Sequence, residues 1–159
     1  MAHSVLIRRT TPVVIAALAV LMIALASVGA NAGRDGIVTK SATGSFENTV
    51  TKLKKAITAN KLVIVKEVPF TKMLGMVGVK AEKMRGFEIF HPRYGKVLYA
   101  NDKNAFLEAP LRILLRDKGG KVMIRYRKPS VVFAGYSGLS SLGSQLDKVF
   151  ANIVGSVAK

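Results

Sequence analysis

The sequence predicts an α+β domain, in which helices pack on an antiparallel or mixed sheet of about four to five strands, preceded by an N-terminal signal peptide. Three observations support this prediction. Short β-branched runs alternate with amphipathic helical stretches, a glycine pair joins two such runs as a hairpin, and the first 32 residues differ in composition from the rest. With 159 residues, the chain has room for one domain after that segment.

Residues 1–32 have the three parts of a secretory signal peptide. A basic start ending in Arg8 and Arg9 precedes an apolar run over residues 13–28, and small residues end at Ala30-Asn31-Ala32. Cleavage there would release a single domain over residues 33–159 into the periplasm or the medium. This run of 16 residues is shorter than the ~20 that cross a bilayer as a helix, so export is favoured over an uncleaved membrane anchor formed by residues 13–28.

The composition limits the chemistry available to the protein. There are 25 Lys and Arg residues against 9 Asp and Glu, a net charge of +16, which suits anionic ligands and surfaces as well as solubility. The chain has no cysteine, and His91 is the only histidine after residue 32. We therefore expect no disulfide, no metal and no cofactor. Export also argues against a specific nucleic-acid partner.

The clearest local structure is a β-hairpin over residues 111–129. The Gly119-Gly120 pair tolerates the positive φ angles of a two-residue turn, which places Leu114 opposite Arg125. Because side chains alternate along a strand, the hairpin has an apolar face and a cationic face. The apolar face carries Ile113, Leu115, Val122, Ile124 and Tyr126. The cationic face carries Arg112, Arg116, Lys118, Lys121, Arg125 and Arg127, with Leu114 and Met123 between them.

The elements before the hairpin follow from periodicity. Residues 36–40 are β-branched and predict a first strand. Ser45 is a natural N-cap for a helix whose apolar positions recur at helical spacing. These positions are Phe46, Val50, Leu53 and Ile57. Residues 62–68 predict a strand buried on much of both faces, ended by Pro69.

Residues 71–83 are ambiguous, because glycines interrupt one helical face. Met73 and Met76 on that face are interpreted as core filler rather than as metal ligands. Residues 86–90 predict a further strand, and residues 94–102 a short helix or an irregular turn. After the hairpin, Pro129 suits a first helical turn, and Ser140 or Ser141 would cap a closing helix. Its apolar stripe comprises Leu142, Leu146, Val149, Phe150, Ile153, Val154 and Val157.

Three of these segments carry a family resemblance. They are the GIVTK strand with the following SFENTVTKLKKAI helix, the hairpin PLRILLRDKGGKVMIRYRKP, and the closing helix. Together they resemble Domain of Unknown Function family 302 over most of residues 36–157. The resemblance implies an antiparallel sheet with helices packed on it and favours a homodimer. It carries over no catalytic residue, because none is assigned in the family.

Two binding hypotheses follow. In the first, an exported, non-enzymatic protein binds an anionic ligand or surface through the cations of the hairpin; its alternative is a solvated outer sheet face. These cations are Arg112, Arg116, Lys121, Arg125 and Arg127. The second places a small-molecule pocket between sheet and helices, lined by His91, Tyr126, Met73 and Met76. An enzyme is the third hypothesis. It ranks below the two binding hypotheses because no nucleophile–base pair or carboxylate pair is evident, but it is not excluded.

Overall fold

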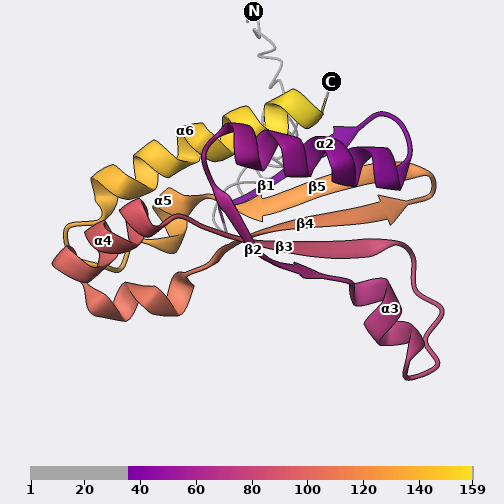
Figure 1. Cartoon of the computed structure of the whole chain (residues 1–159), viewed down its shortest axis with the longest axis horizontal. Coiled ribbons are helices and arrows are strands. Elements are labelled where there is room, and N and C mark those ends of the chain that lie inside the picture. Colours follow the sequence, from indigo (N-terminus) through magenta and orange to yellow (C-terminus); the bar gives the residue numbers. More distant parts are fainter. Residues whose placement is uncertain (1–35, 159) are drawn as a thin grey trace, which may run out of the picture. The chain divides into compact units, whose positions relative to one another are not determined.

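A computed structural model describes residues 36–158, which form a five-stranded sheet with helices packed on it (Figure 1). The strands are β1 (Ile37–Ala42), β2 (Val63–Val68), β3 (Met84–Phe90), β4 (Leu111–Lys118) and β5 (Lys121–Arg127). The helices are α2 (Phe46–Ala59), α3 (Phe70–Gly75), α4 (Pro92–Asn101), the 3-10 helix η1 (Lys103–Glu108), α5 (Pro129–Val132) and α6 (Ser140–Val157). The predicted signal peptide over residues 1–32 lies outside the described residues.

The sheet has the strand order β1-β5-β4-β3-β2, and every neighbouring pair is antiparallel. The antiparallel prediction is therefore confirmed, and the mixed alternative is wrong. The hairpin has the predicted register, with Leu114 opposite Arg125 and Lys118 opposite Lys121. Gly119 and Gly120 have φ angles of 61° and 82°, the left-handed values that a two-residue turn of this kind requires.

The main hydrophobic core lies between one face of the sheet and the helices α2 and α6, which run side by side over it (Figure 1). The sheet contributes Phe87, Ile89, Ile113, Leu115, Val122, Ile124 and Tyr126. The helices contribute Phe46, Val50, Leu53, Ile57, Phe150, Ile153, Val154 and Val157. The apolar face predicted for the hairpin is thus confirmed as core, which leaves its cationic face on the opposite side of the sheet.

A second apolar cluster joins α4, η1 and α6 with the residues that follow α5. Its members are Leu98, Ala105, Phe133, Leu139, Leu142 and Leu146. Next to it, the side chains of Ser130 and Asp147 tie α5 to α6, because the Ser130 hydroxyl donates to Asp147 Oδ2 at 2.6 Å. Residues between 36 and 158 thus form two apolar clusters, so this part of the chain contains a hydrophobic core.

Two local predictions need correction. β2 is an edge strand rather than a strand buried on both faces, and its Val63 and Val65 side chains are 51% and 54% exposed. An edge strand has a neighbour on one side only, and here its pairing with β3 also shifts between Ile64 and Lys66. The closing helix begins after Leu139 without a side-chain cap, so neither Ser140 nor Ser141 is its N-cap.

The ambiguous segment forms the short helix α3, a turn and a return to β3. It projects from the sheet on the side opposite α2 and α6 (Figure 1). Met73 and Met76 are therefore 52% and 79% exposed, and their prediction as core filler is wrong. No helix within residues 36–158 combines the length and the apolar character needed to cross a membrane.

Candidate functional site

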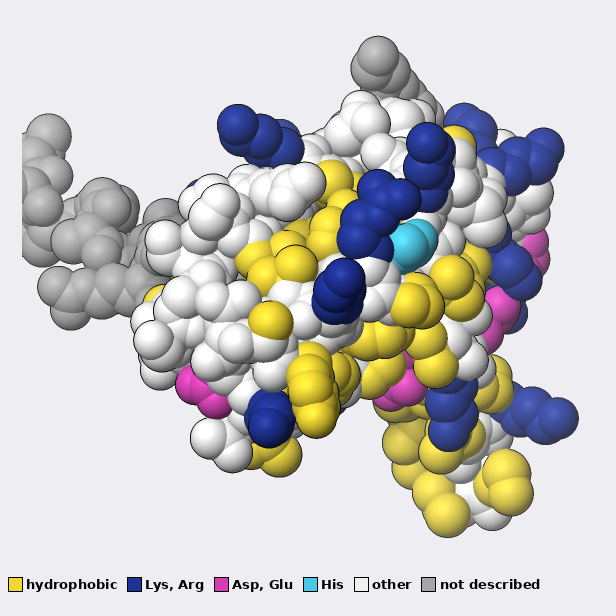
Figure 2. Space-filling model, turned by 60° about the vertical axis from the view of Figure 1, so that its left-hand side comes forward, with side chains coloured by type: hydrophobic (Ala, Val, Ile, Leu, Met, Phe, Trp, Pro, Cys, Tyr) yellow, Lys and Arg dark blue, Asp and Glu magenta, His cyan; other side chains and the backbone are white. Residues whose placement is uncertain are grey.

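A groove of about 400 Å³ lies on the sheet face that α2 and α6 leave uncovered, and we name it the open-face groove. All five strands and α3 contribute to its lining. The residues of the uncovered face that line it are Ile37, Val68, Phe70, Gly86, Glu88, Arg112, Leu114, Arg125 and Arg127. Figure 2 shows that the surface is hollowed beside the projecting α3 segment. The groove thus combines apolar side chains with three guanidinium groups.

Strand register explains how residues far apart in sequence meet in this groove. One row crosses all five strands through Thr39, Arg125, Leu114, Gly86 and Val68, each paired with the next. In the adjacent row Ile37 pairs with Arg127, and Arg112 pairs with Glu88, which pairs with Lys66. Facing neighbours on adjacent strands bring their Cβ atoms to about 5 Å, so the arginines border the apolar centre formed by Leu114 and Gly86.

The three groove arginines differ in how they are held. The Nε atom of Arg125 donates to Thr39 Oγ1 at 3.2 Å, which orients its guanidinium across the sheet. Within residues 36–158, neither Arg112 nor Arg127 forms an ion pair, and the nearby Glu88 carboxylate forms none either. Three guanidinium groups against one carboxylate leave the groove cationic and able to receive an anion.

Two of the five predicted cations are not part of the groove. Arg116 pairs through Nε with the Glu82 carboxylate, which neutralises it. Lys121 lies exposed beside the hairpin turn, opposite Lys118. The structure therefore brings together Arg112, Arg125 and Arg127 and separates Arg116 and Lys121 from them.

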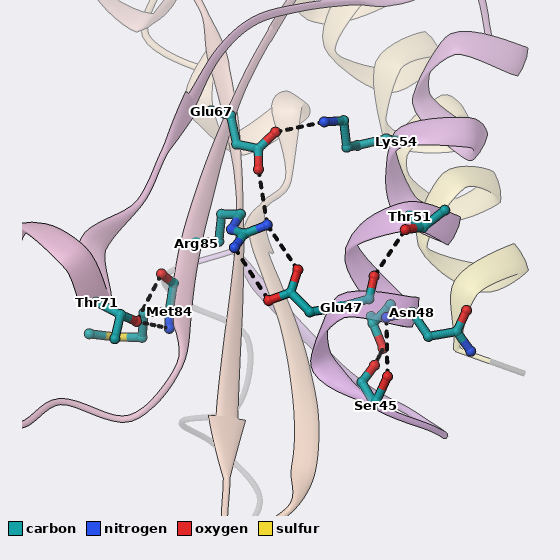
Figure 3. A network of polar contacts seen from close by, with 10 residues as sticks. Ser45, Glu47, Asn48, Thr51, Lys54, Glu67, Thr71, Met84 and Arg85 are labelled. Carbon is teal, nitrogen blue, oxygen red and sulfur yellow. Dashed lines mark hydrogen bonds and ion pairs between the residues drawn. The ribbon is translucent and has the colours of Figure 1, made fainter.

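The wall of the groove is formed by Phe70, which sequence reasoning missed. A Cβ on Gly86 would lie 2.7 Å from Phe70 Cε2, so the ring rests on the bare backbone of β3. The Thr71 hydroxyl, next in the chain, accepts from the Met84 backbone N–H at 2.6 Å (Figure 3). It also donates to the Glu82 carbonyl at 2.9 Å. The signal that could have found this contact is Gly86 itself, because glycine inside a strand marks a close approach.

A second polar cluster, on the helix-facing side of the sheet, is structural. The guanidinium of Arg85 reaches Glu47 Oε2 at 3.2 Å and Glu67 Oε1 at 3.1 Å, and Lys54 Nζ lies 2.8 Å from Glu67 Oε2 (Figure 3). The same guanidinium lies 5.7 Å from the ring centre of Phe46. These contacts tie α2 to β2 and β3. Because the charges satisfy one another, the cluster is not a candidate ligand site.

The hypothesis of a pocket between sheet and helices does not fit the arrangement of its residues. The cavity found there measures about 20 Å³, room for little more than one water molecule. His91 lines it, but Tyr126 is buried against Phe150, with ring centres 5.4 Å apart. Met73 and Met76 are exposed on the projecting segment. The four residues predicted for this pocket therefore do not come together.

His91 and Tyr126 have roles in the fold. The Nδ1 atom of His91 accepts from the Arg93 backbone N–H at 3.0 Å, so the imidazole caps the first turn of α4. Burial, with a smaller contribution from the Asp147 carboxylate, raises the pKa of the Tyr126 hydroxyl. The neutral phenol is therefore favoured in the core.

The fold has a counterpart among solved structures. It is similar to the crystal structure of an uncharacterized conserved DUF302 protein from Bacillus stearothermophilus, with a TM-score of 0.71 and 15% sequence identity. The match covers 77% of this chain and 98% of that chain. At this identity the likeness shows the fold alone. The match takes in nearly the whole of that chain.

No curated protein matches the chain. No relative therefore tests export or the homodimer, and both stay predictions. The family model described as domain of unknown function DUF302 matches residues 37–158, and the chain belongs to that family.

Proposed function

We propose that this is an exported, non-enzymatic binding protein whose open-face groove holds an anionic ligand with an apolar portion. The observation that carries the proposal is the lining of one groove of about 400 Å³ by Arg112, Arg125 and Arg127 around an apolar centre. The export part rests on the N-terminal sequence, in which a basic start, an apolar run and small residues follow one another.

The charged side of the groove favours a carboxylate or phosphate group. A guanidinium presents a planar fork of donors that matches two oxygens of such a group, and charge-assisted hydrogen bonds are stronger than neutral ones. Arg112 and Arg127 have no carboxylate partner among the described residues, so their donors are free to engage a ligand. Arg125 is already oriented by Thr39.

The apolar side of the groove favours a ligand that is more than a bare anion. Leu114, Val68 and Phe70 line the groove together with Ile37, and Phe70 is 38% exposed. Covering these side chains removes apolar surface from water, which contributes roughly 25 cal/mol per Å². A ligand such as an alkyl phosphate or an alkyl carboxylate would satisfy both sides at once. We name this class the amphiphilic anions.

The test compares three probes on the domain formed by residues 33–159. Octyl phosphate has both the head and the apolar tail, inorganic phosphate has only the head, and octanol has only the tail. Titration calorimetry at low and high salt should rank octyl phosphate first, with binding that weakens as salt rises. Equal affinity for inorganic phosphate and octyl phosphate would contradict a role for the apolar lining.

Matched variants separate the groove from general charge. Arg112→Gln combined with Arg127→Gln should weaken octyl phosphate binding at least about tenfold, since each lost charged hydrogen bond costs about 1.5–3 kcal/mol. Lys118→Gln combined with Lys121→Gln removes the same charge from the same strands outside the groove, and should change the affinity less than about twofold. An equal loss in both double variants would overturn the proposal.

A further inference from the structure

The segment over residues 71–83 forms a projection that we name the lobe, and its tip is apolar. Met76 is 79% and Val77 75% exposed, and Met73 and Val79 are exposed by about half. In Figure 2 the lobe lies at the lower right, with hydrophobic side chains at its end and basic side chains beside them. Large apolar side chains gathered at one exposed place indicate an interaction surface.

The lobe is an ordered structure that presents these side chains. At its tip, the Met76 N–H donates to the Lys72 carbonyl at 3.2 Å, and the Val77 and Val79 N–H groups donate to Leu74 at 3.1 and 3.0 Å. At its base, Thr71 binds the backbone of Met84. The tip therefore holds its shape through its own backbone hydrogen bonds, while none of its apolar side chains is buried.

The charge on the lobe identifies the kind of partner. Lys72, Lys80 and Lys83 belong to the same segment as the apolar tip, and residues 71–81 contain no acidic side chain. Glu82, the acidic residue of the lobe, is paired with Arg116. An apolar surface with basic side chains beside it complements an anionic bilayer, where apolar groups enter the headgroup region and lysines contact phosphates.

We propose that the lobe docks this protein on anionic lipid bilayers, with Met73, Met76, Val77 and Val79 entering the headgroup region. A second copy of the chain is the competing partner. Pairing two identical lobes would bring Lys72, Lys80 and Lys83 of each against those of the other, and like charges brought together oppose association. This surface is separate from the open-face groove, so each proposal can fail without the other.

The test is pelleting of the domain formed by residues 33–159 with vesicles of phosphatidylcholine alone or mixed with phosphatidylserine. Use of the domain avoids the apolar N-terminal segment, which would bind lipid by itself. We expect binding to the mixed vesicles and little to the neutral ones. The double variant Met76→Asp with Val77→Asp should bind at least about tenfold more weakly, because the tip can no longer enter the bilayer.

Charge variants test the lysines. Lys72→Gln combined with Lys80→Gln should lower the binding constant about 25-fold, since each lysine near an anionic surface is worth about fivefold. Lys52→Gln combined with Lys55→Gln removes the same net charge from the exposed side of α2, outside both the lobe and the groove, and serves as the matched control, expected within about threefold of wild type. Leu107→Asp, at a site 80% exposed outside the lobe, is the control for the apolar change.

Three results would overturn this inference. One is equal loss of binding in the Lys72, Lys80 variant and the Lys52, Lys55 variant, which would make the effect one of net charge. Another is equal loss in Leu107→Asp and in the Met76→Asp, Val77→Asp variant. The third is a domain that ignores both kinds of vesicle and instead sediments as a dimer that the variant dissociates, which would assign the lobe to a second copy.

Discussion

The ring of Phe70 rests on the backbone of Gly86, so closely that a Cβ on Gly86 would lie 2.7 Å from Phe70 Cε2. This contact joins α3 to the middle of β3 and forms one wall of the open-face groove. It places an apolar ring next to the row that contains Leu114 and Arg125. Because glycine has no side chain, Gly86 thereby helps to determine the shape of the candidate site.

Gly86→Ala should therefore destabilise the domain. The added methyl group displaces the Phe70 ring, and crowding of this kind costs typically about 1–3 kcal/mol of unfolding free energy. Urea denaturation measures the loss. In a double-mutant cycle, Phe70→Ala should relieve much of it, because the two substitutions act on one contact. Additive losses would show that the ring does not limit the space at Gly86.

Gly75→Ala is the matched control for that experiment. Gly75 lies in α3, and a Cβ there would meet no atom within 4 Å. Replacing a helical glycine by alanine usually stabilises by about 0.5–1 kcal/mol. We expect a small gain or no change.

Arg85→Ala should lower the unfolding free energy by about 1 kcal/mol, because it removes the guanidinium between Glu47 and Glu67 (Figure 3). The value is modest because water reaches the Glu47 carboxylate, whose side chain is 63% exposed. Arg85→Lys should lower the unfolding free energy by less, because lysine keeps the positive charge although it lacks the planar guanidinium group. Urea denaturation at low and high salt checks the prediction, and the cost of Arg85→Ala should shrink as salt rises.

Gly119→Val should destabilise the hairpin by about 1–2 kcal/mol, since its φ of 61° is unfavourable for a β-branched residue. Gly119→Asn should cost less, because asparagine tolerates this conformation. Thermal unfolding of the three proteins would test the order. Gly155→Ala, in α6 where a Cβ meets no atom within 4 Å, should not destabilise and serves as the control.

Tyr126 predicts a pH dependence of stability. Burial raises the pKa of its hydroxyl above the unfolded value of about 10, so the folded state holds this proton more tightly. The resulting stability is complete below that unfolded value and is lost as the pH rises through the folded pKa. Wild type should therefore lose more unfolding free energy between about pH 8 and about pH 11 than Tyr126→Phe.

Urea denaturation at the two pH values measures this difference. Tyr99→Phe, which removes the hydroxyl of a side chain that is 64% exposed and leaves Tyr126 in place, is the control. A loss of equal size in wild type and Tyr126→Phe would show that the Tyr126 proton does not contribute.

Local patterns in the sequence predicted the parts of the fold that local physics controls. The Gly119-Gly120 turn sets the hairpin register, because two residues with positive φ leave one way to join the strands. Ser45 caps α2 as predicted, accepting from the Asn48 N–H at 3.2 Å. Prediction failed for Met73 and Met76, because periodicity identifies a helical face without showing whether anything covers it.

The candidate site was predicted in part. Alternation along the hairpin identified Arg112, Arg125 and Arg127, since a strand directs every second side chain to the same face. It could not show that Glu82, from another segment, neutralises Arg116. Nor could it supply Phe70, which reaches the groove only because β2 and β3 are neighbours.

The sequence by itself determined the α+β class, the hairpin, the helix α2 and the separation of an apolar from a cationic face, because turns, caps and periodicity act over a few residues. Only the tertiary structure decided which cations share a groove, that the cavity found under the helices within residues 36–158 measures only about 20 Å³, and that the lobe stands clear of the core. These features depend on strand order and on contacts between distant segments. Packing across the whole domain determines these contacts, and the conformational preferences of a few neighbouring residues do not.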